Sequence, residues 1–236
     1  MAGGFFISDK DFGRITVYLR YDMRSITARW RPEGLRINAP MQMPQRDILA
    51  FIENNREKLS NLKAPDLSYF FGEKIRCFRH IVTIKPHNGK KGVVGYGGDN
   101  EDLHITLHPE VDFSSKNVTS TISSCLTRLM ADRAEATLIP FANEVAESLG
   151  ATPARFVIGR GMRKLGHCTV KREVQLSYNI MFFPDELVRY IICHELAHLT
   201  EMNHSARFHA LCNHYCQGRE KHLERALKHF SWPILR

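Results

Sequence analysis

The sequence predicts an α+β protein, and three observations lead to this prediction. Apolar and basic residues alternate with a period of two through much of the first half, as in half-buried strands. From about Ser115 the apolar positions follow the helical period. A helix near the C-terminus then holds several histidines. We therefore expect a β-rich segment with one helix at residues 1–113 and a mainly helical domain with a short sheet at residues 114–236.

Composition limits the class of protein. The 236 residues are 43% hydrophobic, which is enough for one sizeable core or two small ones. No window approaches eighteen apolar residues, so we expect no membrane insertion, and six thinly spread cysteines are expected to be reduced thiols in a cytoplasmic protein. The formal net charge of +8 favours acidic partners, and nucleic acid is one of them.

The first half of the chain is predicted to contain short strands and one helix. Residues 12–39 look like an antiparallel meander that breaks at Asp22 and at the turn of residues 32–34. Pro44 begins an amphipathic helix that ends near Asn61. Two further strands are expected, at 74–84 and 102–108, on either side of a glycine-rich hairpin loop at 86–101.

The second half is predicted to be mainly helical. Residues 114–139 form one long candidate helix, and Pro140 either kinks it or begins a second helix that Gly150 terminates. RFVIGR (155–160) and EVQLSYN (173–179) have the composition of strands. Pro184, followed by two acidic residues, begins a helix that continues through HELAHL (194–199).

The last of these helices contains the motif HExxH. His194 and His198 lie one turn apart on the same face, so that two imidazole nitrogens can bind one ion. Glu195 is offset round the helix, where its carboxylate can take a proton from metal-bound water. By chance, roughly 0.04 copies of this motif are expected in a chain of this composition, so the motif is specific. It predicts a zincin-like catalytic region that binds zinc.

Catalytic zinc requires a third protein ligand. The preferred candidate is His204, because Ser205 can cap the following helix and fix its orientation. The spacing HExxHxxxxxH is that of metzincins, but Glu201 replaces their glycine, and we expect Asn203 to supply the left-handed turn. A gluzincin-like alternative takes Glu220 or Glu224 as the third ligand.

At this point the chain resembles the YgjP-like metallopeptidases, which are relatives of the SprT-like proteases. The segment RSITARWRPEGLRINAP and the signature HELAHLTEMNHSARF are similar to those of the family. The resemblance implies His194, His198 and His204 as zinc ligands and Glu195 as the catalytic residue. Upstream, RKLGHCTVKREVQLSYN departs from the usual RWGSCS pattern, with Leu165 in place of tryptophan and His167 in place of serine.

Several weaker sites have competing structural interpretations. Cys168 is expected to be a small buried thiol. Cys212 and Cys216 share a helical face with His209, and packing explains them better than a second metal. An arginine-rich N-terminal surface is a candidate for nucleic-acid binding, although solvated sheet residues explain the same pattern. Its residues are Arg14, Arg20, Arg24, Arg29, Arg31 and Arg36, with Tyr18, Tyr21 and Trp30.

Together these features predict a zinc metallopeptidase acting on a peptide or protein substrate. We expect the strand EVQLSYN to pair with an extended peptide. His167, Tyr178 and Arg163 are candidates for stabilising the oxyanion. The alternatives are a metal-dependent hydrolase of another substrate, such as a nucleoside triphosphate, and a DNA-associated protease.

Overall fold

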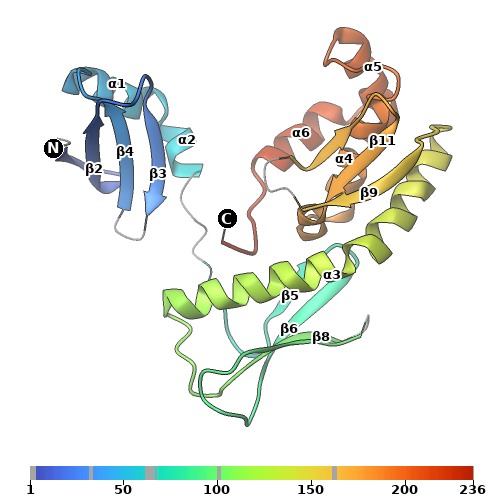
Figure 1. Cartoon of the computed structure of the whole chain (residues 1–236), viewed down its shortest axis with the longest axis horizontal. Coiled ribbons are helices and arrows are strands. Elements are labelled where there is room, and N and C mark those ends of the chain that lie inside the picture. Colours follow the sequence, from blue (N-terminus) through green and yellow to red (C-terminus); the bar gives the residue numbers. More distant parts are fainter. Residues whose placement is uncertain are drawn as a thin grey trace. The chain divides into compact units, whose positions relative to one another are not determined.

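The computed structural model of the chain describes residues 4–31, 34–61, 67, 69–99, 102–160 and 164–235, without the side chains of Arg31 and Asn61. It confirms the α+β class. The elements form two compact units, Met1–Ala64 and Pro65–Arg236, called the N-terminal and C-terminal units below. Figure 1 labels their helices and strands.

The sheet of the N-terminal unit is mixed. Its strands are β1 (Gly4–Asp9), β2 (Gly13–Arg20), β3 (Thr27–Arg31) and β4 (Gly34–Pro40), in the order β1-β2-β4-β3. β2 and β4 are parallel, so the predicted antiparallel meander is wrong at this pair. The reason lies in burial: Leu35, Ile37 and Ala39 of β4 are all fully buried, which favours a central position for β4 and leaves β3 at the edge.

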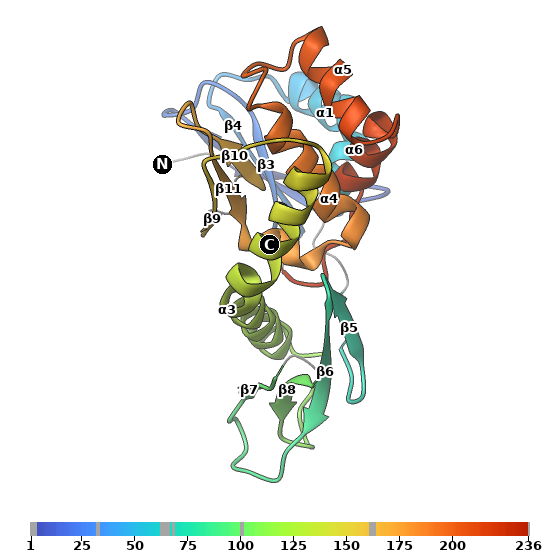
Figure 2. The ribbon, with the colours of Figure 1, turned by 90° about the vertical axis from the view of Figure 1, so that its right-hand side faces the viewer.

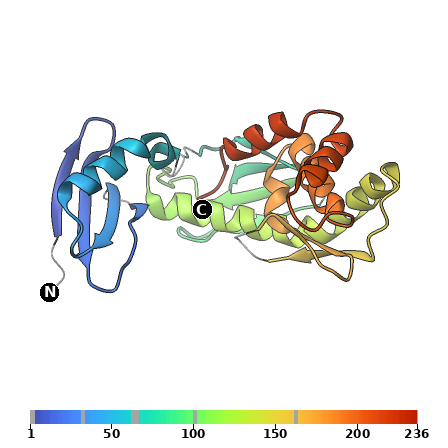
Figure 3. The same ribbon diagram turned by 90° about the horizontal axis from the view of Figure 1, so that it is seen from above.

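Two helices cover one face of this sheet. The predicted helix is divided at Asn55 into α1 (Gln45–Asn54) and α2 (Arg56–Asn61). Helix α1 lies across the sheet (Figure 3), and Ile48, Ile52 and Leu59 pack in one core with the inward side chains of the strands. Trp30 lies on this covered face and donates a hydrogen bond to the carbonyl of Leu59 at 2.7 Å.

The C-terminal unit begins with a second mixed sheet. Its strands are β5 (Lys74–Cys77), β6 (His80–Pro86), β7 (Gly95–Gly97) and β8 (Leu103–Leu107), in the order β5-β6-β8-β7. The single strand predicted at 74–84 is a hairpin, because the chain turns at Phe78 and Arg79, where Arg79 has a φ of 55°. The glycine-rich segment predicted as a loop contributes the edge strand β7.

Helix α3 (Lys116–Ser148) contacts both sheets of this unit, and it continues through Pro140 with a visible bend (Figures 1 and 2). Its buried residues share one core with side chains from Tyr69 to Ile234. The division between units therefore falls at residues 64 and 65 and differs from the predicted boundary at 113 and 114. The change of sequence period marks the start of α3, but β5 to β8 pack against that helix and belong to its core.

The remaining elements position the histidine-rich segment. A three-stranded sheet has the order β10-β11-β9, with β9 (Arg155–Gly159), β10 (Gly166–Cys168) and β11 (Glu173–Ser177). A 3-10 turn, η1 (Tyr178–Phe182), leads to α4 (Asp185–Ala197), α5 (Ala206–Tyr215) and α6 (Glu220–Lys228). β10 and β11 contact α4 (Figure 2). No helix of the described residues is long and apolar enough to cross a membrane.

Candidate metal centre

Helix α4 places the first two histidines at its C-terminal end. The apolar side chains of Leu187, Ile191 and Leu196 are buried and anchor the helix in the core. His194 and His198 are one turn apart, and their ring centroids are 5.1 Å from each other. Both imidazoles therefore face the same region beside the helix, as the i, i+4 spacing predicts.

The chain after α4 brings His204 back to this pair. The N–H groups of Thr200 and Glu201 donate to the carbonyl of Ala197 and close the helix end. The Nε2 atoms of His204 and His194 are 3.0 Å apart, and the candidate ligand atoms of His194, His198 and His204 all lie within 4.8 Å of one another. We call these three residues the histidine cluster.

The local backbone and the next helix hold the third histidine. Ser205 accepts a hydrogen bond from the N–H of Phe208 at 3.3 Å and caps α5, as predicted. Asn203 does not have a positive φ, so the expected left-handed turn is wrong at that residue. Ordinary turn hydrogen bonds, including the 2.8 Å bond from Ser205 N–H to the carbonyl of Asn203, reverse the chain instead.

The surroundings orient the imidazoles and favour the neutral form of His194 and His198. Nδ1 of His198 lies 3.0 Å from the carbonyl of Glu201, to which it can donate, and this contact leaves Nε2 free for a metal. Burial, together with the neighbouring His198 and His204, lowers the pKa of His194 to about 4. Phe208 packs against all three rings at centroid distances of 4.5 to 4.8 Å. Three converging imidazoles fit a zinc ion, because imidazole nitrogen is a common ligand of this metal.

Glu195 is a buried carboxyl next to the histidine cluster. Its side chain is 7% exposed, and burial raises its pKa to about 7. Lys164 and the backbone N–H of Cys168 oppose this shift, because both favour the charged form. A carboxyl with a pKa close to neutral can both accept and return a proton at physiological pH.

Strand β10 passes directly over Glu195, and Gly166 makes this approach possible. A Cβ atom at position 166 would lie 2.5 Å from Cγ and 2.5 Å from Oε1 of Glu195. Any other residue there would displace the carboxylate or the strand. The glycine therefore has a steric role at the site.

A cavity of about 270 Å³ opens beside His194 and Glu195. Apolar side chains of Leu165, Ile191 and Leu227 form much of its wall. Lys164, Gly166 and Tyr190 complete the lining. Tyr190 was missed by sequence analysis, although it lies one turn before His194 on the same helix. Lys164 gave no sequence signal, since a lone lysine in a loop is ordinary.

The structure describes two of the three predicted oxyanion candidates. His167 is exposed on β10 and is close enough to His198 to contribute to lowering its pKa. Tyr178 is 9% exposed in η1 and does not line the cavity. Arg163 lies outside the described residues.

The alternative third ligands lie elsewhere. Glu220 accepts a hydrogen bond from Nδ1 of His209 at 2.8 Å, and Glu224 is exposed.

Cys212 and Cys216 do not form a metal-binding group with His209. Among the described residues, only the histidine cluster brings at least three possible ligand atoms close enough together to hold one ion. Cys168 is 4% exposed, and burial raises its pKa. All six cysteines are buried free thiols.

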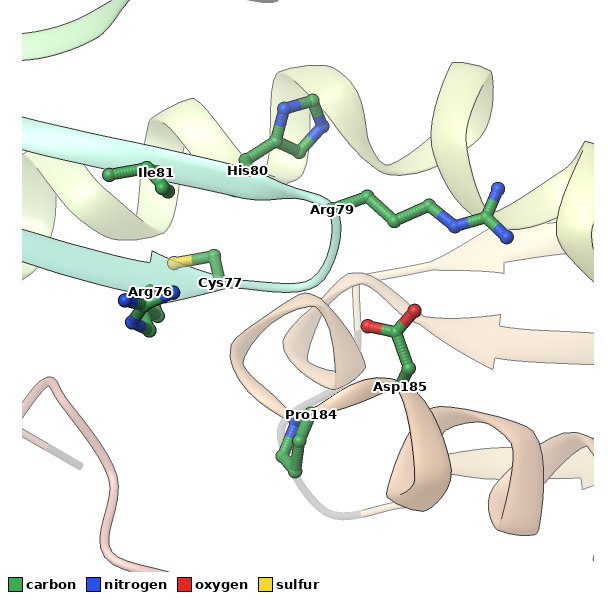
Figure 4. Close-up of a pocket in the computed structure, with 7 residues that line it drawn as sticks. All are labelled: Arg76, Cys77, Arg79, His80, Ile81, Pro184 and Asp185. Atoms are coloured by element: carbon green, nitrogen blue, oxygen red, sulfur yellow. The ribbon is translucent and has the colours of Figure 1, made fainter.

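A larger cavity, of about 500 Å³, lies between the β5–β6 turn and the start of α4 (Figure 4). Arg79 extends over Asp185, whereas the ring of His80 points toward α3. Asp185 precedes His194 by nine residues, or about 14 Å of helix. None of the predicted site residues that the structure describes lines this cavity, so it is separate from the histidine cluster.

Comparison with known protein families gives a match over most of the chain. The model of the family described as YgjP-like, metallopeptidase domain, matches residues 24–230. No curated protein sequence and no solved structure matches the chain.

Proposed function

The chain belongs to the YgjP-like family of metallopeptidase domains, and from this premise we propose that it is a zinc-dependent peptidase. The histidine cluster would hold the zinc, and Glu195 would act as the general base. The observation that supports this most strongly is the convergence of three imidazoles beside one buried carboxyl. Nitrogen ligands favour zinc over magnesium and calcium, which prefer oxygen.

The residues of the site have distinct tasks in this proposal. A bound zinc supplies a Lewis acid that polarises the scissile carbonyl and makes water more acidic. Glu195 accepts the proton of the attacking water and later delivers it to the leaving amine. Its burial and its pKa of about 7 suit both transfers. His167 is our candidate for a hydrogen bond to the oxyanion, because it is exposed on the strand above the site.

The substrate would pair with β10. β11 was the predicted docking strand, but β9 and β10 flank it on both sides. Among the described residues β10 pairs with β11 alone, so its other edge can accept an extended peptide. Gly166 would then place the peptide backbone next to Glu195, and the apolar walls of the neighbouring cavity suit a hydrophobic side chain of the substrate.

The lining of the cavity beside Glu195 favours a peptide over a nucleoside triphosphate as the substrate. Among the described residues, the cavity beside Glu195 has one cationic side chain, Lys164, and mainly apolar walls. This lining suits a peptide better than a triphosphate, which needs several cationic or backbone N–H contacts.

Six buried free thiols fit a reducing compartment, and we propose a cytoplasmic location.

Cleavage of an unfolded protein tests the proposed function. We expect the zinc-loaded protein to cut a reduced, alkylated and fluorescein-labelled protein. A chelator should abolish the cleavage and added zinc should restore it, because the metal is required for the chemistry. Phosphate or pyrophosphate release from nucleoside triphosphates is measured in parallel. Metal-dependent release of phosphate without any peptide cleavage would overturn the peptidase in favour of another hydrolase.

A further inference from the structure

The face of the N-terminal sheet opposite α1 and α2, called the outer face below, carries basic and aromatic side chains. On each strand the side chains that point away from α1 and α2 alternate with the buried ones. Phe6 and Tyr18 lie on this outer face, with 58% and 37% of their surface exposed. Arg14, Arg29 and Arg36 lie on it as well. No described residue of the outer face within the four strands is acidic.

The aromatic and basic side chains form two stacks. The Arg14 guanidinium lies 3.6 Å from the centroid of the Phe6 ring, and that of Arg36 lies 4.2 Å from the centroid of the Tyr18 ring. Phe6 and Arg36 are both register partners of Thr16, on opposite sides of β2. The two stacks are thus neighbours at the centre of the sheet. Trp30, a predicted member of this surface, lies on the other face, and the side chain of Arg31 lies outside the described residues.

Polar groups on β4 add hydrogen-bonding capacity to the same place. Among the described residues, Nε of Arg36 and Oδ1 of Asn38 are buried and have no hydrogen-bond partner. One is a donor and the other an acceptor, and the two residues point to the same face of one strand. Leaving buried polar groups unpaired is costly, and a ligand would pair with these two atoms only after the side chains over them move.

Four described carboxylates of this unit bind arginines that do not belong to the two stacks. Asp9, Asp11 and Glu53 all bind Arg56. Asp22 binds Arg20 at the end of β2. The arginines of the two stacks consequently keep their positive charge available to an external anion.

We propose that this outer face binds single-stranded nucleic acid. Bases would stack on Phe6, Tyr18 and the guanidinium planes, while the arginines contact phosphates. Four-stranded sheets with exposed aromatic residues recognise two or three unstacked bases in this manner. A duplex hides its bases, so it could use only the positive charge of this surface. The proposal is independent of the zinc site.

Fluorescence anisotropy of the full chain with fluorescein-labelled dT20 and rU20 tests the proposal. Phe6→Ala/Tyr18→Ala should weaken binding by about 5-fold to 100-fold for each stacked base lost. The matched control is Phe70→Ala/Tyr96→Ala in the C-terminal unit, whose rings are 58% and 40% exposed. It should bind as the wild type does. If the alanine variant fails to fold by circular dichroism, Phe6→Leu/Tyr18→Leu replaces it, because leucine keeps the apolar volume without a ring face.

The charge contribution is tested by salt dependence. Arg14→Gln/Arg29→Gln should reduce the slope of log K against log salt by about 1.4, because each phosphate contact to a single strand contributes about 0.7. Arg46→Gln/Lys58→Gln removes the same charge from the exposed residues of α1 and α2 and should leave the slope close to that of the wild type. Preference for dT20 or rU20 distinguishes DNA from RNA as the ligand.

Three results would overturn the proposal. The first is no binding of either oligonucleotide at low salt. The second is equal loss of affinity in the outer-face variants and their controls. The third is binding of duplex DNA as tight as that of single strands, which would indicate attraction by charge alone. A Glu195→Gln protein should bind as tightly as the wild type, which separates this test from the peptidase.

Discussion

Glu195→Gln is expected to lower peptide cleavage by about 10²-fold to 10⁴-fold, or roughly 3 to 5 kcal/mol of activation free energy. Glutamine keeps the shape and the hydrogen-bonding reach of the side chain but cannot accept the proton. Zinc should remain bound, because all three imidazoles of the histidine cluster are unchanged. Cleavage rate and zinc content per chain are measured on the same preparations. Full activity in a zinc-loaded variant would exclude Glu195 as the general base.

The stability of the metal-free protein provides a control for this substitution. The pKa of Glu195 is about 7 in the fold, against a reference value of 4.5. The protonated carboxyl of Glu195 therefore contributes fully to the free energy of unfolding below pH 4.5. This contribution is lost as the pH rises to about 7. Since the glutamine side chain of the variant does not ionise, the variant should gain about 3 kcal/mol relative to the wild type between pH 4.5 and 8. Denaturant unfolding at several pH values measures the difference, and a constant difference would contradict the burial argument.

His204→Ala is expected to have the largest effect on the metal. His204 is the ligand that lies beyond α4 and its C-cap His198, and its Nε2 approaches that of His194 to 3.0 Å. Its removal leaves two protein ligands, too few for a stable zinc site. The loss of affinity should exceed the 10-fold to 100-fold that removal of an outer-shell partner causes. Competition with a zinc-binding dye measures this, and peptide cleavage should disappear together with the metal.

Glu224→Ala is the matched control for the ligand substitution. Glu224 is exposed on α6, so its loss should leave the zinc affinity unchanged. Glu220→Ala removes the partner of His209, whose ring lies 6.3 Å from that of His204, and should have at most an outer-shell effect. If either glutamate variant loses the metal while His204→Ala keeps it, the gluzincin-like arrangement is correct and the histidine cluster is not the site.

The histidine cluster was accessible from the sequence because its geometry is local. His194 lies in α4 and His198 is its C-cap, and only five residues lie between His198 and His204, so helix periodicity and a cap at Ser205 place all three. The parallel pairing of β2 with β4 was not accessible. It depends on which strand buries most surface in the assembled sheet, and short alternating strands look alike in the sequence.

The surroundings of Glu195 were also beyond the sequence. The cavity wall combines residues from the β10 segment, α4 and α6, which only tertiary packing brings together. The contact of Gly166 with Glu195 spans 29 positions, and nothing in the local pattern of β10 indicates it. For the same reason the free edge at β10, rather than β11, became evident only when the pairing of both neighbours was known.

Anomalous diffraction at the zinc edge, from a crystal of the zinc-loaded protein, tests the proposed centre most directly. We expect one zinc per chain, about 2.0–2.1 Å from one nitrogen each of His194, His198 and His204. The carboxylate of Glu195 should lie nearby without binding the ion, because a general base must remain free to accept a proton. A zinc bound by the thiols of the core, by Glu220 or Glu224, or by Glu195 itself would contradict the proposed centre.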